Sequence, residues 1–239
     1  MSKTIAIFGA GSGLGLAVAR RFGAEGYRVA LVARRKERLE ELRAALANEG
    51  VEAHTFTADL ADHTRLGATV DEIGSALGGI DVIEYSPAGI TEQPVATLDL
   101  DLDNLQPQLD VRLLAPIVLV RHVLPAMIER GEGGLLFGLG SVGSQPVSFM
   151  SNVGIAFAGL RNYIYTLNSS LADKGVYAGA LTIGALIEKS EAQEKFDAKT
   201  AFTSAQGVVR VWPEDLADRF WDMYAKRDRV EEVVGGFEG

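Results

Sequence analysis

Three glycines near the amino terminus, Gly9, Gly13 and Gly15, have the spacing of a turn that binds phosphate groups. The first would allow a tight turn, the second would let the backbone approach a pyrophosphate, and the third would let a helix pack closely on a strand. A helix that begins here points its N–H groups and the positive end of its dipole at the phosphates. The turn therefore predicts a dinucleotide site that includes Ser12 and Leu14, and a plain glycine-rich turn is the alternative.

A second group of residues bears on the ribose of such a nucleotide. About 20 positions after the glycine turn, an NAD-specific protein carries an acidic residue that binds the ribose 2′-hydroxyl. This chain has Arg34, Arg35 and Lys36 there, and no acid. Because a guanidinium binds a 2′-phosphate through charge-assisted bidentate hydrogen bonds, Arg34 and Arg35 favour NADP(H) over NAD(H). A solvated basic helix start is the alternative.

The elements that would position these residues follow from the apolar pattern. Expected strands are 5–8, 29–33, 53–57, 82–85, 135–139, 177–183 and 230–234, and expected helices lie near 14–25, 35–48, 62–77, 108–130, 152–173 and 214–227. This alternation predicts an α/β fold of the Rossmann type, a doubly wound parallel sheet of about seven strands with helices on both faces. Since no linker or repeat interrupts it, residues 1–239 are expected to form one domain.

The segment 188–207 departs from this pattern because it is polar and mixed in charge. It follows the sixth strand, where open α/β sheets place their ligand crevice. The position predicts a lid on the substrate side of the site, and an ordinary surface excursion is the alternative.

Composition limits the classes of partner. A net charge of −9 argues against nucleic acid or an anionic membrane, because both are polyanions. The chain has no cysteine, which excludes disulfides and a thiol nucleophile and fits a cytoplasmic location. The start runs directly into a strand pattern, so no signal peptide is expected. The three histidines are scattered without ligand spacing, so no metal site is expected.

Taken in order along the chain, these features resemble the short-chain dehydrogenase/reductase family. The resemblance also rests on segments 59–60, 81–83, 124–127, 140–143 and 175–176, and it covers roughly residues 3–230. It implies a nicotinamide cofactor and carbonyl–alcohol chemistry. It further implies a homodimer or homotetramer built on the helices near 108–130 and 152–173.

The resemblance assigns further roles to individual residues. Asp59 and Leu60 would lie beside the adenine, although a turn or helix-cap aspartate is the alternative for Asp59. Ala88 and Gly89 would contact the cofactor, within a Ser-Pro-Ala-Gly segment that replaces the Asn-Asn-Ala-Gly of the family. Ser141 would hold the oxygen of the substrate.

The family's Tyr-x-x-x-Lys pair is missing. Aligning residues 158–160 with the family pattern places Val153 at the tyrosine position and Phe157 at the lysine position. Valine has no proton to donate, and phenylalanine offers neither charge nor hydrogen bond. Loss of a positioned general acid forfeits about 10²–10⁴ in rate. Arg112 falls where the family has its helix asparagine, and could bind an anionic ligand or a partner's carboxylate, or could lie on the helix surface.

Another tyrosine could in principle donate the proton. Tyr163 and Tyr165 lie ten and twelve residues beyond Val153, which is about 15 Å or more along a helix and too far. Tyr85 ends the fourth strand on the crevice side and is the candidate substitute, with a half-buried structural aromatic as the alternative.

Three functions remain open. The first is an NADP(H)-binding protein with a degenerate catalytic site and weak or no standard carbonyl reduction, acting as a sensor or a support subunit. The second is an active oxidoreductase whose proton comes from Tyr85, water or the substrate. The third is a structural protein that binds no nucleotide.

Overall fold

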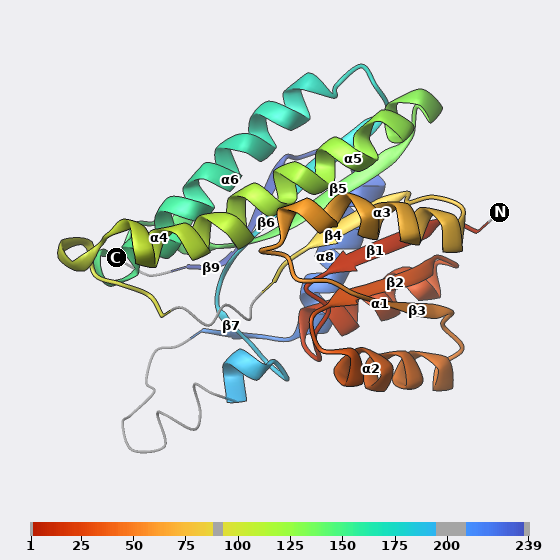
Figure 1. Cartoon of the computed structure of the whole chain (residues 1–239), viewed down its shortest axis with the longest axis horizontal. Coiled ribbons are helices and arrows are strands. Elements are labelled where there is room, and N and C mark those ends of the chain that lie inside the picture. Colours follow the sequence, from red (N-terminus) through yellow and green to blue (C-terminus); the bar gives the residue numbers. More distant parts are fainter. Residues whose placement is uncertain (1, 88–92, 195–208, 237–239) are drawn as a thin grey trace.

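The centre of the molecule is a parallel sheet of seven strands in the order β3-β2-β1-β4-β5-β6-β9 (Figure 1). The computed structural model describes residues 2–87, 93–194 and 209–236. The strands are β1 (Thr4–Phe8), β2 (Arg28–Ala33), β3 (Ala53–Thr57), β4 (Val82–Tyr85), β5 (Gly133–Gly140), β6 (Val176–Gly184) and β9 (Glu231–Gly235). After β3 the chain returns to place β4 beside β1, so the sheet grows in two directions. The predicted doubly wound fold is confirmed.

Helices cover both faces of the sheet (Figure 1). One face carries α3 (His63–Leu77), α5 (Ala115–Arg130) and α6 (Ser151–Ser170), and the other carries α1 (Leu14–Ala24), α2 (Lys36–Asn48) and α8 (Pro213–Lys226). Side chains of β1 alternate between the two cores, with Ile7 facing α1 and Phe8 facing the opposite layer. Both faces are buried, which explains why the central strands read as continuous apolar runs.

The helix predicted near 108–130 begins earlier and is interrupted. Its first part is α4 (Leu102–Leu109), which Asp101 caps by accepting a hydrogen bond from the Asn104 N–H at 2.8 Å. A π-helical turn, η2 (Asp110–Leu114), then leads into α5. Pro116 has no N–H to donate to the carbonyl four residues earlier, and that carbonyl lies within the wider turn.

Among the described residues, one helical run is long and apolar enough, by length and composition, to cross a membrane. This run is Leu102–Arg130, and an 18-residue window within it has a mean hydropathy of 1.7. A core helix of a soluble protein passes the same test, and α5 packs Leu119, Val123 and Met127 against the sheet. The run is therefore weak evidence for a membrane span.

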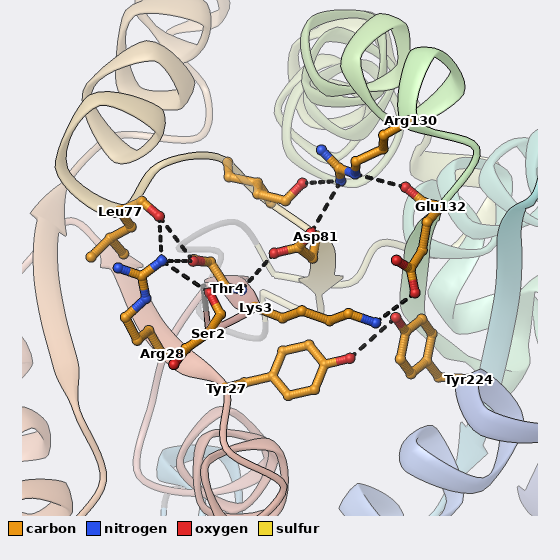
Figure 2. A network of polar contacts seen from close by, with 11 residues as sticks. Ser2, Lys3, Thr4, Tyr27, Arg28, Leu77, Asp81, Arg130, Glu132 and Tyr224 are labelled. Atoms are coloured by element: carbon orange, nitrogen blue, oxygen red, sulfur yellow. Dashed lines mark hydrogen bonds and ion pairs between the residues drawn. The ribbon is translucent and has the colours of Figure 1, made fainter.

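The amino-terminal ends of the central strands are joined by a polar network (Figure 2). Asp81, just before β4, accepts a hydrogen bond from the Thr4 N–H at 2.7 Å and lies 3.6 Å from the Arg130 guanidinium. Lys3 and Glu132 form an ion pair at 2.5 Å beside it. Polar contacts thus close this edge of the sheet, and the glycine turn lies at the opposite edge.

Two short strands were not predicted. They are β7 (Leu186–Ile187) and β8 (Arg210–Val211), which pair in parallel as a separate small sheet. Two residues are too few to give a periodic pattern in the sequence. The pairing of β7 with β8 holds in place the segment that follows β6.

Candidate functional site

The glycine turn links the end of β1 to the start of α1. The N–H groups of Gly9 and Ala10 both donate to the Val32 carbonyl, at 2.9 and 3.0 Å, and so fasten the turn to β2. Gly9 has a φ of +94°, and a Cβ there would lie 2.6 Å from the Pro87 Cα. No side chain fits at this position, which is the close-turn role predicted for the first glycine.

Gly13 and Gly15 shape the start of α1. A Cβ on Gly15 would lie 3.0 Å from the Ala10 Cα, so the missing side chain lets the helix lie close to the turn. Gly13 is the N-cap residue, and no side chain caps the helix start. Leu14 is buried in the core beneath. The Leu16 N–H donates to the Gly11 carbonyl at 2.9 Å, and the other N–H groups at this helix start have the chemistry that binds a phosphate.

Arg34 and Arg35 directly follow β2 and are exposed. The Arg35 guanidinium forms an ion pair with Glu191, a residue that follows β7. A shallow depression beside this pair is lined by Arg35, Glu37, Arg38, Glu41, Glu191 and Glu194. The basic groups proposed for a 2′-phosphate therefore lie among carboxylates.

Asp59 follows β3 at the same edge of the sheet. Its carboxylate accepts a hydrogen bond from the Ala61 N–H at 3.0 Å, and its carbonyl accepts one from the Asp62 N–H at 3.1 Å. Asp59 thus makes the contacts of a turn aspartate, while Leu60 is buried in the core. Ala88 and Gly89 lie outside the described residues.

Ser141 directly follows β5, at the start of a short 3-10 turn, η3 (Ser141–Gly143). Its side chain is buried, and its Oγ lies 2.9 Å from the position of a Cβ on Gly184. The glycine at the end of β6 therefore leaves room for the hydroxyl, which faces that strand end.

Val153 and Phe157 occupy the first turns of α6 and are both buried in the apolar core. The Phe157 ring lies 2.8 Å from the position of a Cβ on Gly140, and the Phe157 Cβ lies 2.8 Å from that on Gly143. These glycines flank Ser141, so the phenylalanine packs directly against the backbone around the serine. Neither side chain at the two positions can exchange a proton.

Arg112 brings a cation to this place from η2. Its guanidinium lies 4.5 Å from the centre of the Phe157 ring, and its Nε donates to the Gln108 Oε1 at 2.8 Å. Burial lowers the pKa of Arg112 to about 10, so it stays charged at neutral pH. Arg112 is half-buried rather than on the open helix surface, and no carboxylate in the described ranges forms an ion pair with it.

Tyr85 is buried at the end of β4. Its hydroxyl donates to the Val111 carbonyl, and burial raises its pKa well above the ordinary value, partly offset by the charge of Arg112. Donation to a ligand would require this hydrogen bond to break.

Glu84, which was not among the predicted site residues, is fully buried in the middle of β4 between Ile7 of β1 and Leu136 of β5. Neither carboxylate oxygen has a hydrogen-bond partner in the described part of the chain. Burial raises the pKa of Glu84 to about 8, and the nearby Ser86 side chain offsets part of the rise. The available signal was an acidic residue inside an otherwise apolar strand.

Of the predicted lid, residues 188–194 are described, and 195–207 lie outside the described residues. The described part contacts the glycine turn, where the Ser12 Oγ donates to the Lys189 carbonyl at 3.2 Å. No group of three or more histidine, aspartate or glutamate side chains suited to a metal ion occurs in the ranges that the structure describes.

Known proteins with similar sequences and structures can be compared with this arrangement. The family model described as short chain dehydrogenase matches residues 3–200. Sulfoacetaldehyde reductase 2 of Chromohalobacter salexigens is 33% identical over 177 residues, which cover 74% of this chain and 69% of that protein. Serine 3-dehydrogenase of Agrobacterium fabrum is 32% identical over 228 residues, which cover 92% of this chain and 87% of that protein.

A solved structure supports the same fold. A tryptophan variant of actinorhodin polyketide ketoreductase, crystallised with NADPH, superimposes with a TM-score of 0.86 at 24% identity. The match covers 98% of this chain and 96% of the ketoreductase. The matched family model, the relatives and the common fold show that the chain belongs to the short chain dehydrogenase family.

Proposed function

We propose that this protein binds NADP(H) and catalyses little or no standard carbonyl reduction, acting as a redox or ligand sensor or as a support subunit. The observation that carries the proposal is the buried pair Val153 and Phe157, which leaves no proton donor and no ammonium group at the start of α6. A protein of this family that keeps the glycine turn but has apolar side chains at the catalytic positions is suited to bind the cofactor without catalysing a reaction.

The cofactor site is proposed from three strand ends that meet at one edge of the sheet. The glycine turn would hold the pyrophosphate through the uncapped start of α1. Arg34 and Arg35, after β2, would bind the 2′-phosphate, and Asp59 with Leu60, after β3, would lie beside the adenine. The NADPH held by the structurally similar ketoreductase supports the choice of cofactor. A bound NADPH would supply a hydride.

The catalytic end of the site would retain the Ser141 hydroxyl, near the Arg112 guanidinium. The Ser141 hydroxyl faces the end of β6 and could hydrogen-bond a ligand oxygen. A serine hydroxyl is a poor acid, and the core around Val153 and Phe157 supplies no base. Standard carbonyl reduction would therefore proceed about 10²–10⁴ times slower than with a positioned acid.

An active NADP-dependent oxidoreductase with another proton source is the second candidate. The named relatives are a reductase and a dehydrogenase, and Ser141 is retained, which favour this alternative. Water or an activated substrate fits the role of proton source better than Tyr85, because the Tyr85 hydroxyl is held by the Val111 carbonyl.

Two measurements test the proposal. Mixing NADPH with the protein should enhance its fluorescence, and the absence of any binding would leave only a structural role. Oxidation of NADPH across a panel of ketones, quinones and enones should be slow, whereas Val153→Tyr combined with Phe157→Lys should raise ketone reduction by about 10² or more. Rapid turnover by the unaltered protein would favour the second candidate, and its loss in Tyr85→Phe would identify the proton donor.

The assembly is proposed to be a homodimer or homotetramer in the cytoplasm, without nucleic acid or membrane as a partner. The proposed contact lies on the helical run through α4 and α5 and on α6. Large apolar side chains are exposed on these helices at Leu102, Ile128 and Ile155. Light scattering of the purified protein would determine its oligomeric state.

A further inference from the structure

The residues that follow β7 lie directly against the glycine turn. We refer to residues 188–191 as the strap. A Cβ built on Gly13 would lie 2.9 Å from the Ser190 Cβ and 3.2 Å from the Ser190 Cα. A phosphate group, which is larger than a methyl group, does not fit between Gly13 and Ser190 in this conformation.

Hydrogen bonds hold the strap in this conformation. The Ser12 Oγ donates to the Lys189 carbonyl at 3.2 Å, which connects the turn to the strap. Lys189 has a φ of 60°, in the left-handed region that L-residues seldom adopt. The Ser190 Oγ donates to the Ile187 carbonyl at 2.7 Å and accepts from the Gln193 N–H at 3.1 Å.

Two ion pairs fasten the strap to neighbouring elements. The Lys189 ammonium lies 2.7 Å from the Glu214 carboxylate at the start of α8. Glu191 pairs with Arg35 at the start of α2, and the side chains of the pair are 35% and 64% exposed. The Glu191 carboxylate is thus paired with the guanidinium that is proposed to bind the 2′-phosphate of the cofactor.

We propose that the strap is a self-inhibitory element, in which Ser190 occludes the pyrophosphate position and Glu191 holds the strap closed through Arg35. This inference rests on the proposed cofactor site. Since cofactor would bind only when the strap lifts, the apparent dissociation constant equals the intrinsic one divided by the fraction of molecules with a lifted strap. Part-exposed ion pairs stabilise by at most about 1 kcal/mol, so loss of the Glu191 pair should change that constant by about two- to fivefold.

Glu191→Gln should therefore tighten the binding of NADPH and of NADH by about two- to fivefold each, because both carry a pyrophosphate. Glu194→Gln is the matched control, since it removes the same charge from the same depression without touching the Arg35 pair. It should change neither affinity by more than about 1.5-fold. Titration by the fluorescence of the reduced cofactors measures the dissociation constants of the unaltered protein and of both variants for NADPH and NADH.

Arg35→Ala separates the two roles of the arginine. Loss of the ion pair frees the strap and should tighten NADH, whereas loss of the guanidinium removes the 2′-phosphate contact and should weaken NADPH. A residue that only bound the 2′-phosphate would leave the affinity for NADH unchanged.

A second readout follows the strap itself. The chain has no cysteine, so Ala192→Cys can carry a single environment-sensitive fluorophore next to Glu191. Saturating NADPH should shift the emission, and Glu191→Gln without cofactor should shift it in the same direction.

The outcomes separate the two proposals. If the unaltered protein binds NADPH but neither Glu191→Gln nor Arg35→Ala tightens NADH, the strap proposal is wrong and the cofactor proposal stands. Equal tightening by Glu194→Gln would also overturn the strap, because general charge would explain the effect. If neither the unaltered protein nor Glu191→Gln binds NADPH or NADH, both proposals fail.

Discussion

At the scale of single residues, Glu84 is the group whose surroundings conflict most with its chemistry. Its carboxyl is fully buried, and burial raises its pKa to about 8, so it is protonated and neutral at pH 7. In the unfolded chain the same carboxyl ionises near its ordinary pKa of about 4.3. Between these two values the folded protein binds one proton more than the unfolded chain, and the free energy of unfolding falls as pH rises.

Glu84→Gln should remove this pH dependence. The stability that the unaltered protein shows at pH 5 should decline by a few kcal/mol by pH 8, at about 1.4 kcal/mol per unit of raised pKa. The glutamine variant should lack that part of the decline, since its side chain does not titrate. Urea unfolding at pH 5, 6.5 and 8 measures both proteins, and equal slopes would contradict the assignment.

Arg112 and Phe157 form a second unusual contact, a cation over an aromatic ring. A partly desolvated contact of this kind contributes about 0.5–2 kcal/mol. Arg112→Gln should therefore destabilise the protein by about that amount, and by much less when Phe157→Leu is already present. A double-mutant cycle by urea unfolding measures the coupling, and additive effects within about 0.3 kcal/mol would show that the contact contributes nothing.

These residues also mark how far the sequence predicts the site. Gly9 and Gly15 make the close approaches expected of a phosphate-binding turn, because backbone geometry there follows from local spacing. The contact of Arg112 with Phe157 joins two helices, and the ion pair of Arg35 with Glu191 spans most of the chain. No local pattern encodes such pairs, so neither was predicted.

At the scale of elements, the long helical run through α4, η2 and α5 differs most from expectation. Apolar periodicity, which predicts strands and helices, is strong in buried elements. The run starts at Leu102 instead of near 108, because the polar residues of α4 hide its periodicity, while Asp101 and Asn104 form a capping box at its start. The β5 strand is likewise longer than predicted, since its first two residues are glycines.

Asp101→Ala should destabilise the protein by about 1 kcal/mol, because it leaves the Asn104 N–H without its side-chain acceptor. Asp103→Ala is the control, since Asp103 lies in the first turn of the same helix and is not the N-cap. Thermal unfolding of both variants measures the difference, and equal losses would indicate that helix charge, rather than the cap, is responsible.

At the scale of the whole molecule, the amino-terminal and carboxyl-terminal ends of the strands have different roles. Polar contacts around Asp81 join the amino-terminal ends of the strands (Figure 2). Every candidate cofactor residue in the described ranges lies at the carboxyl-terminal edge. The parallel order of the strands imposes this division, because all of them run in the same direction. The alternation of strands and helices predicts the doubly wound order. It does not predict the contacts of Asp81 with Thr4 and Arg130, which are distant from it in the sequence.

Asp81→Asn should destabilise the fold and leave cofactor affinity unchanged. The carboxylate accepts from the buried Thr4 N–H and faces Arg130, so its loss as an anion should cost about 1–3 kcal/mol. Urea unfolding measures the loss, and titration with NADPH should give the same dissociation constant as for the unaltered protein. A weakened constant would mean that the two edges are coupled.

The close contact of Ser190 with the glycine turn also affects which nucleotides the protein would fail to bind. Adenine nucleotides without a 2′-phosphate carry the same diphosphate, but they offer nothing to replace the carboxylate on Arg35. Such molecules would have to displace the strap through their pyrophosphate contacts alone, without the additional attraction between a 2′-phosphate and Arg35. With its pyrophosphate site covered, the protein would remain unliganded in the presence of abundant metabolites. It would bind mainly the one nucleotide that bears the additional charge.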